Sequence, residues 1–144
     1  MEGFLFSGSA LYKDAYLETD YTVREGRRTL VLRPGVRDVR VDRLLRRFRA
    51  RSAAFITAFN PYSLSRGVIV NECAHRRLVS ELKGRNIAFV DGYGRGLAGD
   101  WPAERSVLAF GVSRLTAAAI GRRFRQNAIV FVRLGTATEL LMLR

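Results

Sequence analysis

The sequence has few of the residues that cross-link a small protein or hold a metal. Its single cysteine, Cys73, excludes an internal disulfide and a cysteine metal cluster, and its single histidine, His75, has no second histidine with which to share a metal. We therefore expect no metal and no cofactor, and a cytoplasmic location. No apolar run approaches the roughly 20 residues of a membrane-spanning helix, so we expect no membrane partner.

Lysine is also scarce, so the net charge of +12 comes almost entirely from arginine. Such a charge favours polyanions through the release of counterions. One reading is a sequence-nonspecific nucleic-acid-binding surface, and the other is solvated arginine that reflects genome composition. The densest group lies on and just after a predicted helix over 38–49: Arg40, Arg43, Arg46, Arg47, Arg49 and Arg51.

The chain is long enough to bury a core and short enough for a single domain over 1–144, since 48% of its 144 residues are apolar. The spacing of apolar residues and of turn residues predicts three N-terminal features. These are a helix over 11–18, a β-hairpin from strands over 21–24 and 29–33, and a helix over 38–49 with Asp38 as its N-cap.

The segment over about 52–134 predicts an α+β fold with a ferredoxin-like βαββαβ core. Its strands are expected over 53–58, 86–91, 105–112 and 128–134, its helices over 68–83 and 113–125, and an extra C-terminal strand over 138–143. A mixed α/β open sheet with helices on both faces is the alternative, because strand 29–33, helix 38–49 and strand 53–58 also alternate.

A glycine-rich stretch follows the second strand of this core. Asp91 to Asp100 contains four glycines, and it lacks both a P-loop motif and a dinucleotide-binding fingerprint. We expect a flexible loop there.

Polar side chains gather where the strands and helices of this topology end. The end of strand 53–58, the turn between the second and third strands, and the end of helix 113–125 are expected at one edge of the sheet. We name this edge the rim. Its candidate ligand-binding residues are Asn60, Tyr62, Asn71, Tyr93, Arg95, Trp101, Glu104, Gln126 and Asn127.

Three separated segments carry a resemblance to a known family: FITAFNP from Phe55, DWPAE from Asp100 and FRQNAI from Phe124. Together they resemble an uncharacterised bacterial family, domain of unknown function 3293, over roughly residues 10–134. The sequence departs from the family pattern at Phe59, where tryptophan is frequent, and at Arg125, where glycine is frequent. The resemblance implies the boundaries and the rim, and no particular reaction.

These observations predict a small soluble binding or regulatory domain, without enzymatic activity, whose small ligand or protein partner docks at the rim. Weak nucleic-acid binding through the arginines is one alternative. An enzyme with an undescribed polar site at the same rim is another.

Overall fold

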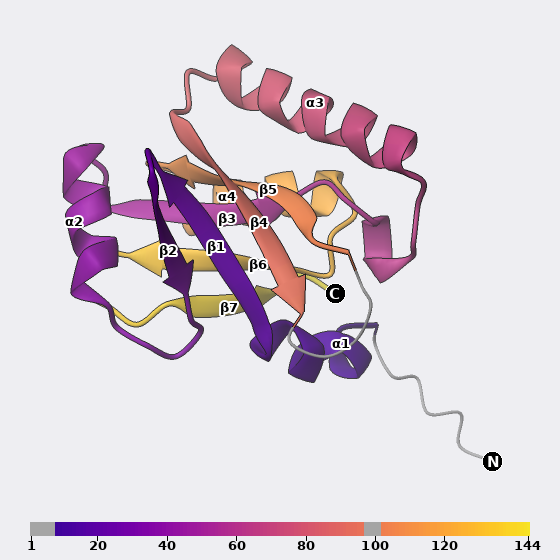
Figure 1. Ribbon diagram of the computed structural model, residues 1–144, viewed down its shortest axis with the longest axis horizontal. Coiled ribbons are helices and arrows are strands. Elements are labelled where there is room, and N and C mark those ends of the chain that lie inside the picture. Colours follow the sequence, from indigo (N-terminus) through magenta and orange to yellow (C-terminus); the bar gives the residue numbers. More distant parts are fainter. Residues whose placement is uncertain (1–7, 97–101) are drawn as a thin grey trace.

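A computed structural model shows how these segments are arranged; it describes residues 8–96 and 102–144, with side chains from residue 13 onward. Four helices and seven strands, joined by one 3-10 turn, make up this part of the chain (Figure 1). In chain order they are α1 (Gly8–Leu17), β1 (Thr19–Glu25), β2 (Arg28–Leu32), α2 (Val39–Arg47), β3 (Ser52–Thr57), η1 (Pro61–Ser63), α3 (Val68–Gly84), β4 (Phe89–Gly96), β5 (Glu104–Phe110), α4 (Arg114–Arg123), β6 (Ala128–Arg133) and β7 (Glu139–Met142).

The seven strands form one curled sheet in the order β2-β1-β4-β5-β3-β6-β7. Every neighbouring pair in it is antiparallel. The prediction of a mixed helix-and-strand fold is confirmed, and the four strands expected at its centre are adjacent. Helices lie on both faces, as in the alternative prediction, but the pairing is antiparallel, whereas an open α/β sheet of βαβ units pairs its strands in parallel.

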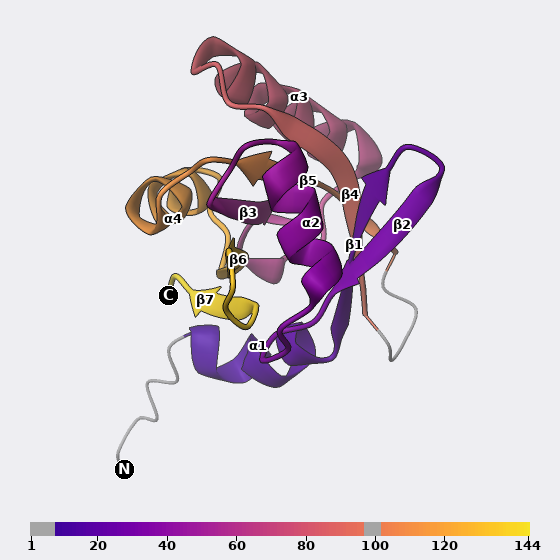
Figure 2. The ribbon, with the colours of Figure 1, turned by 90° about the vertical axis from the view of Figure 1, so that its left-hand side faces the viewer.

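The central strands are buried on both faces, and each face has its own apolar cluster. On the outer face, Ala54 and Ile56 of β3 pack with α3 and α4 through residues such as Leu78 and Ile120. On the inner face, Ala53 and Phe55 pack with α2 and the β1–β2 hairpin. Figure 2 shows α3 and α4 on one side of the sheet and α2 on the other, within the curl. Successive side chains of each strand point to opposite faces of the sheet, so the core is divided into two layers.

Polar side chains cap the N-termini of α2, at Asp38 as the sequence predicts, and of α4, at Ser113. A carboxylate oxygen of Asp38 accepts a hydrogen bond from the Arg40 N–H (2.9 Å), and Ser113 Oγ accepts one from the Thr116 N–H (3.1 Å). Helix α2 ends at Arg47, two residues before its expected end, because the chain turns with a positive φ at Arg49. None of the helices in the described residues is long and apolar enough to cross a membrane.

The curl brings the two edges of the sheet together. The Gly35 N–H, after β2, donates to the Thr138 carbonyl (2.7 Å), and the Thr138 N–H donates to the Val36 carbonyl (3.0 Å). The buried Asp42 of α2 accepts a hydrogen bond from the Gly135 N–H (2.9 Å) in the turn between β6 and β7. We call these three bonds the seam. They cover backbone groups that an open sheet edge would expose.

The prediction of a flexible loop over 91–100 is wrong for residues 91–96, and residues 97–100 lie outside the described residues. Instead of leaving the sheet there, the chain continues as β4 to Gly96, paired with β1 from Gly92 to Gly96 and with β5 up to Gly94. Glycine is disfavoured in strands because it is flexible and has no side chain to pack. Its low strand propensity is the reason that the sequence predicted a loop, and the two flanking strands outweigh that propensity.

Candidate functional site

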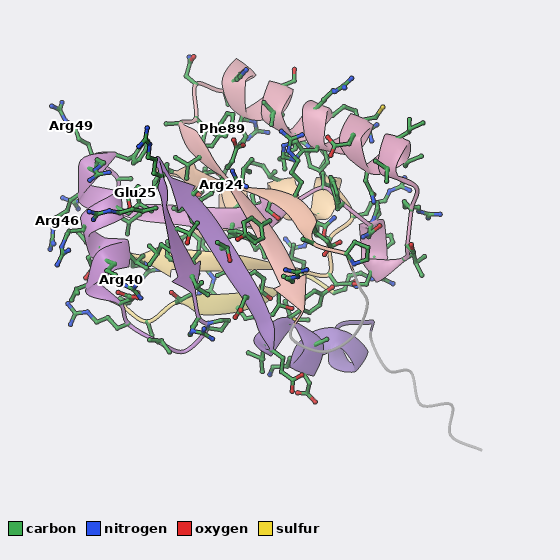
Figure 3. All side chains as sticks on the ribbon, in the orientation of Figure 1. Arg24, Glu25, Arg40, Arg46, Arg49 and Phe89 are labelled. Atoms are coloured by element: carbon green, nitrogen blue, oxygen red, sulfur yellow. The ribbon has the colours of Figure 1, made fainter. Side chains whose placement is uncertain are left out.

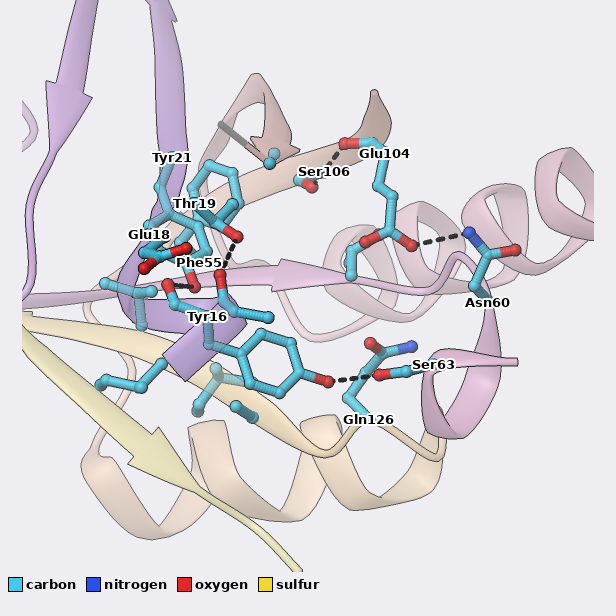
Figure 4. Close-up of a pocket in the computed structure, with 18 residues that line it drawn as sticks. Tyr16, Glu18, Thr19, Tyr21, Phe55, Asn60, Ser63, Glu104, Ser106 and Gln126 are labelled. Atoms are coloured by element: carbon cyan, nitrogen blue, oxygen red, sulfur yellow. Dashed lines mark hydrogen bonds between the residues drawn. The ribbon is translucent and has the colours of Figure 1, made fainter. Parts of the chain in front are cut away.

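A cavity of about 330 Å³ opens on the inner face of the sheet, at the end that α2 does not cover. Helix α1 lies across this end (Figure 1). Figure 4 shows the cavity between Tyr16 of α1, Tyr21 of β1, Phe55 of β3 and Glu104 of β5. The aromatic and aliphatic groups form its walls, and polar groups lie where β3 ends and β5 begins and also where α1 meets β1.

Two glycines of β4 leave room for this cavity. Gly94 and Gly96 both line it, and a Cβ at Gly94 would lie 3.7 Å from Thr19 Cγ2, an ordinary contact distance. Gly92, earlier on the same face of the strand, is different: a Cβ there would lie 2.6 Å from the Thr22 carbonyl oxygen and 2.9 Å from the Phe55 ring. Glycine at every second position therefore lets Phe55 pack tightly at one point and leaves space beside it.

Asn60 connects the polar end of the cavity to the rest of the fold. Its Nδ2 donates to Glu104 Oε2 (2.8 Å), and its Oδ1 accepts from the Arg66 N–H and from Asn71 Nδ2 (both 2.9 Å). The Asn60 N–H in turn donates to Asn71 Oδ1 (2.9 Å). Asn60 and Asn71 are both buried. One amide thus joins the end of β3, the start of α3 and the start of β5.

The backbone beside the cavity is held in an uncommon conformation. Asn60, Tyr62 and Ser63 have φ values of 49°, 56° and 60°, in the left-handed region that most non-glycine residues avoid. Their backbone is fixed by hydrogen bonds from the Tyr62 N–H to the Arg125 carbonyl (2.6 Å) and from the Ser63 N–H to the Asn60 carbonyl (2.8 Å). A left-handed backbone at a non-glycine residue is strained. Backbone strain of this kind persists only where the surrounding structure fixes it, and it clusters at functional sites.

Two tyrosines fix the opposite wall. The Tyr21 hydroxyl donates to the Tyr16 carbonyl (2.5 Å), and the Tyr16 hydroxyl lies 2.5 Å from Ser63 Oγ, which also accepts from Asn127 Nδ2 (3.0 Å). Burial raises the pKa of Tyr21 far above its ordinary value. The Tyr21 hydroxyl therefore stays protonated and neutral.

The structure brings some of the predicted rim residues together and separates others. Asn60, Glu104 and Gln126 line the cavity, and Gln126 Nε2 donates to the Phe59 carbonyl (3.1 Å). Asn71 and Asn127 support them through Asn60 and Ser63.

The other predicted rim residues lie elsewhere. Tyr62 does not line the cavity, and its ring lies 4.2 Å from the Arg144 guanidinium carbon. Strand alternation places Tyr93 and Arg95 on the face opposite Gly94. Trp101 lies outside the described residues.

Several lining residues were not predicted from the sequence. They come from α1, β1, β3, β5 and β7, and they include Tyr16, Tyr21, Phe55, Thr57, Ser106 and Leu140. Only the spacing of Gly92, Gly94 and Gly96 signals the cavity in the sequence, since glycine at every second position of a strand removes side chains from one face.

His75 lies on the outer face and not in the cavity. It is buried, its ring stands edge-on to Phe59, and neither ring nitrogen has a hydrogen-bond partner among the described residues. Burial, with a smaller contribution from the Arg105 guanidinium, lowers the pKa of His75, while Glu72 and Asp91 oppose this shift. The imidazole is therefore neutral in the folded protein at pH 7.

Because the pKa of His75 is lowered in the folded protein, we expect the protein to lose stability in mild acid. The unfolded chain binds a proton at His75 near its ordinary pKa of about 6.5 and the folded chain does not, so stability falls as the pH drops below that value. The slope approaches about 1.4 kcal/mol per pH unit for one proton. Urea denaturation at pH 7.5 and 5.0 measures it, and His75→Leu is expected to reduce the pH dependence. An equal pH dependence in both proteins would show that other groups cause it.

The arginines of the predicted nucleic-acid surface divide into two groups. Arg40 pairs with Asp38 (2.8 Å) and Arg47 with Glu25, so part of their charge is balanced within the fold. Arg43, Arg46, Arg49 and Arg51 are exposed and form no ion pair in the part of the chain that the structure describes. Figure 3 shows Arg46 and Arg49 projecting from the region of α2 away from the sheet.

The fold and the cavity together define a small mixed α/β domain: a curled antiparallel sheet with helices on both faces and a partly polar cavity at one end. The chain belongs to the family described as Protein of unknown function (DUF3293), whose model matches residues 56–129. The match runs from β3 to β6 and includes Asn60, Glu104 and Gln126. It confirms the resemblance of the three sequence segments. No curated protein and no solved structure matches the chain.

Proposed function

We propose that this protein is a binding domain that holds a small molecule in the inner-face cavity. The cavity itself carries the proposal: its volume of about 330 Å³ lies at the lower end of the range of roughly 300–1,000 Å³ that is usual for ligand pockets. Its walls are mostly apolar, with Phe55, Val130 and Leu140 among them, while Asn60 and Glu104 supply polar groups at one end. Ligand sites commonly combine apolar walls with a few fixed polar groups.

Two further features support binding at this place. The left-handed backbone at Asn60 and Ser63 borders the cavity, and strain of this kind is retained where a site needs a fixed geometry. The polar groups are also held in place from outside, since Asn71 fixes Asn60. A cavity whose polar groups are fixed before binding loses less side-chain entropy when a ligand binds.

We further propose that β3–β6 with α3 and α4 form a ferredoxin-like unit within a single domain, to which the hairpin, α2 and β7 are additions. The strand order β4-β5-β3-β6 and the packing of α3 and α4 on one face support this assignment. Every observation that would support an enzyme at the same rim supports ligand binding equally well.

Filling the cavity tests the binding proposal. Gly94→Val is expected to weaken the binding of indole, a small neutral aromatic probe, by about tenfold or more, because the new side chain occupies the space that the probe needs; a tenfold change is about 1.4 kcal/mol. Calorimetric titration measures it, and circular dichroism confirms the fold. Gly84→Val is the matched control, because Gly84 ends α3 with nothing within 4 Å of an added Cβ. Equal affinity in both variants would exclude the cavity as the site.

Nucleic-acid binding stays a second candidate, favoured by the exposed arginines on and just after α2 that form no ion pair among the described residues. Arg43→Gln, Arg46→Gln and Arg49→Gln together are expected to weaken binding to duplex DNA similarly for all sequences. They would also flatten the salt dependence by up to about 2.7 in slope, or about 0.9 per lost phosphate contact. Filter binding from 25 to 200 mM salt measures this.

The control for this experiment removes equal charge elsewhere. Arg76→Gln, Arg77→Gln and Lys83→Gln on α3 make the same change in net charge at exposed positions. If both triple variants lose the same affinity, the effect belongs to net charge alone. If the unaltered protein retains no DNA at 25 mM salt, the arginines are solvated surface.

A further inference from the structure

We infer that the ligand of the cavity carries a positively charged hydrogen-bond donor, a small ammonium or amidinium group, on an apolar body. This inference rests on the proposed function and adds the chemical class of the ligand. It comes from the directions of the hydrogen bonds among the residues that line the cavity.

Four hydroxyl groups in the lining donate their hydrogens to backbone carbonyls. Thr19 donates to the Ala15 carbonyl (2.7 Å) and Tyr21 to the Tyr16 carbonyl (2.5 Å). Thr57 donates to the Arg105 carbonyl (2.7 Å) and Ser106 to the Glu104 carbonyl (2.9 Å). A hydroxyl has one hydrogen and two lone pairs, so each of these oxygens can offer a ligand only an acceptor.

The amide groups of the lining follow the same pattern. Gln126 Nε2 gives its two hydrogens to the Phe59 and Phe124 carbonyls (3.1 and 3.2 Å), which leaves its oxygen as an acceptor. Asn60 Nδ2 gives one hydrogen to Glu104 and keeps the other. The polar side chains of the cavity therefore present mostly acceptors, and a ligand group with several donors complements them.

The charges in the lining favour a cation as well. Glu104 and Glu18 line the cavity, and none of the described residues that line it is arginine or lysine. The whole chain carries 25 of these basic residues against 13 acidic ones, so the cavity is locally acidic in a strongly basic protein. An ammonium group has three donors and no acceptor, whereas a carboxylate has acceptors only and would face like groups here.

A series of three ligands with the same apolar body tests the inference. These are 3-phenylpropylammonium, 3-phenylpropan-1-ol and 3-phenylpropanoate, titrated by calorimetry into the full chain and into Gly94→Val. The ammonium is expected to bind roughly tenfold or more tightly than the alcohol, because hydrogen bonds from a charged donor are the stronger ones. The carboxylate is expected to bind most weakly, although the net charge of +12 favours anions at long range.

Glu104→Gln locates the effect, since it removes the charge and keeps an oxygen that can accept from Asn60. It is expected to lower the ammonium affinity by about tenfold, as the loss of one charged partner does, and the alcohol affinity by less than about twofold. Glu72→Gln is the control, because Glu72 pairs with Arg105 (2.8 Å) and does not line the cavity. It makes the same charge change and should leave the ratio of ammonium to alcohol affinity unchanged. If Glu104→Gln does not fold, the series on the unaltered protein still decides.

Different results would contradict the cationic ligand class and the proposed binding function. If the alcohol or the carboxylate binds as tightly as the ammonium, and Gly94→Val abolishes that binding, the cationic class is wrong and the cavity remains a binding site. If none of the three ligands nor indole binds, the proposed function falls, and the ligand class falls with it.

Discussion

Replacing Asn60 with alanine is expected to lower the free energy of unfolding by about 2–4 kcal/mol. The change removes the partners of the Arg66 N–H, the Asn71 amide and Glu104. A buried donor left without a partner costs about 1–3 kcal/mol. Alanine also tolerates the left-handed backbone of residue 60 poorly, at a cost of about 1–2 kcal/mol. Urea denaturation followed by circular dichroism measures the difference.

Asn60→Gly separates these two causes. Glycine adopts a positive φ readily, so this variant loses the side-chain hydrogen bonds without the backbone penalty. We expect it to be more stable than Asn60→Ala by about 1 kcal/mol. If both variants unfold at the same urea concentration as the unaltered protein, the hydrogen bonds of Asn60 do not stabilise the fold.

Gly92→Ala is expected to destabilise the protein by about 2–3 kcal/mol, a typical cost of overpacking a core. The added Cβ would approach the Thr22 carbonyl oxygen to 2.6 Å and the Phe55 ring to 2.9 Å. The carbonyl belongs to the paired strand β1 and cannot move without disturbing the pairing of β1 with β4. Thermal unfolding monitored by calorimetry gives the loss.

Gly94→Ala is the matched control, two residues along the same face of β4. Its Cβ would meet only Thr19 Cγ2, at 3.7 Å. The substitution also reduces the freedom of the unfolded chain, so we expect stability to be unchanged or to rise by up to about 1 kcal/mol. Similar losses at both positions would mean that glycine is needed for its backbone and not for the space beside it.

Much of the rim follows from the order of elements alone. Because β3 and β4 run in the same direction in the predicted core, the end of β3, the start of β5 and the end of α4 had to lie at one edge. Asn60, Glu104 and Gln126 do line one cavity there. This prediction needed only the lengths and types of the elements, which strong apolar periodicity indicates well.

The other wall of the cavity could not be predicted, for two physical reasons. The glycines of β4 have low strand propensity, and their strand forms because β1 and β5 pair with it on both sides. Tyr16 and Tyr21 reach the cavity through the curl of the sheet, which joins segments far apart in the sequence. No local pattern encodes that curl, so the sequence could not place these two tyrosines at the cavity.

The seam also has a consequence for synthesis of the protein on the ribosome. Gly35 and Val36 find their backbone partners at Thr138, about a hundred residues later in the chain. At the usual elongation rate of about 5–20 residues per second, the roughly 100 residues between these positions take about 5–20 s to make. Throughout that time the hairpin and α2 lack the strand that completes their surroundings. We therefore expect the nascent chain to expose its inner face until the segment around Thr138 has been made, which makes it a client for the chaperones that meet emerging chains.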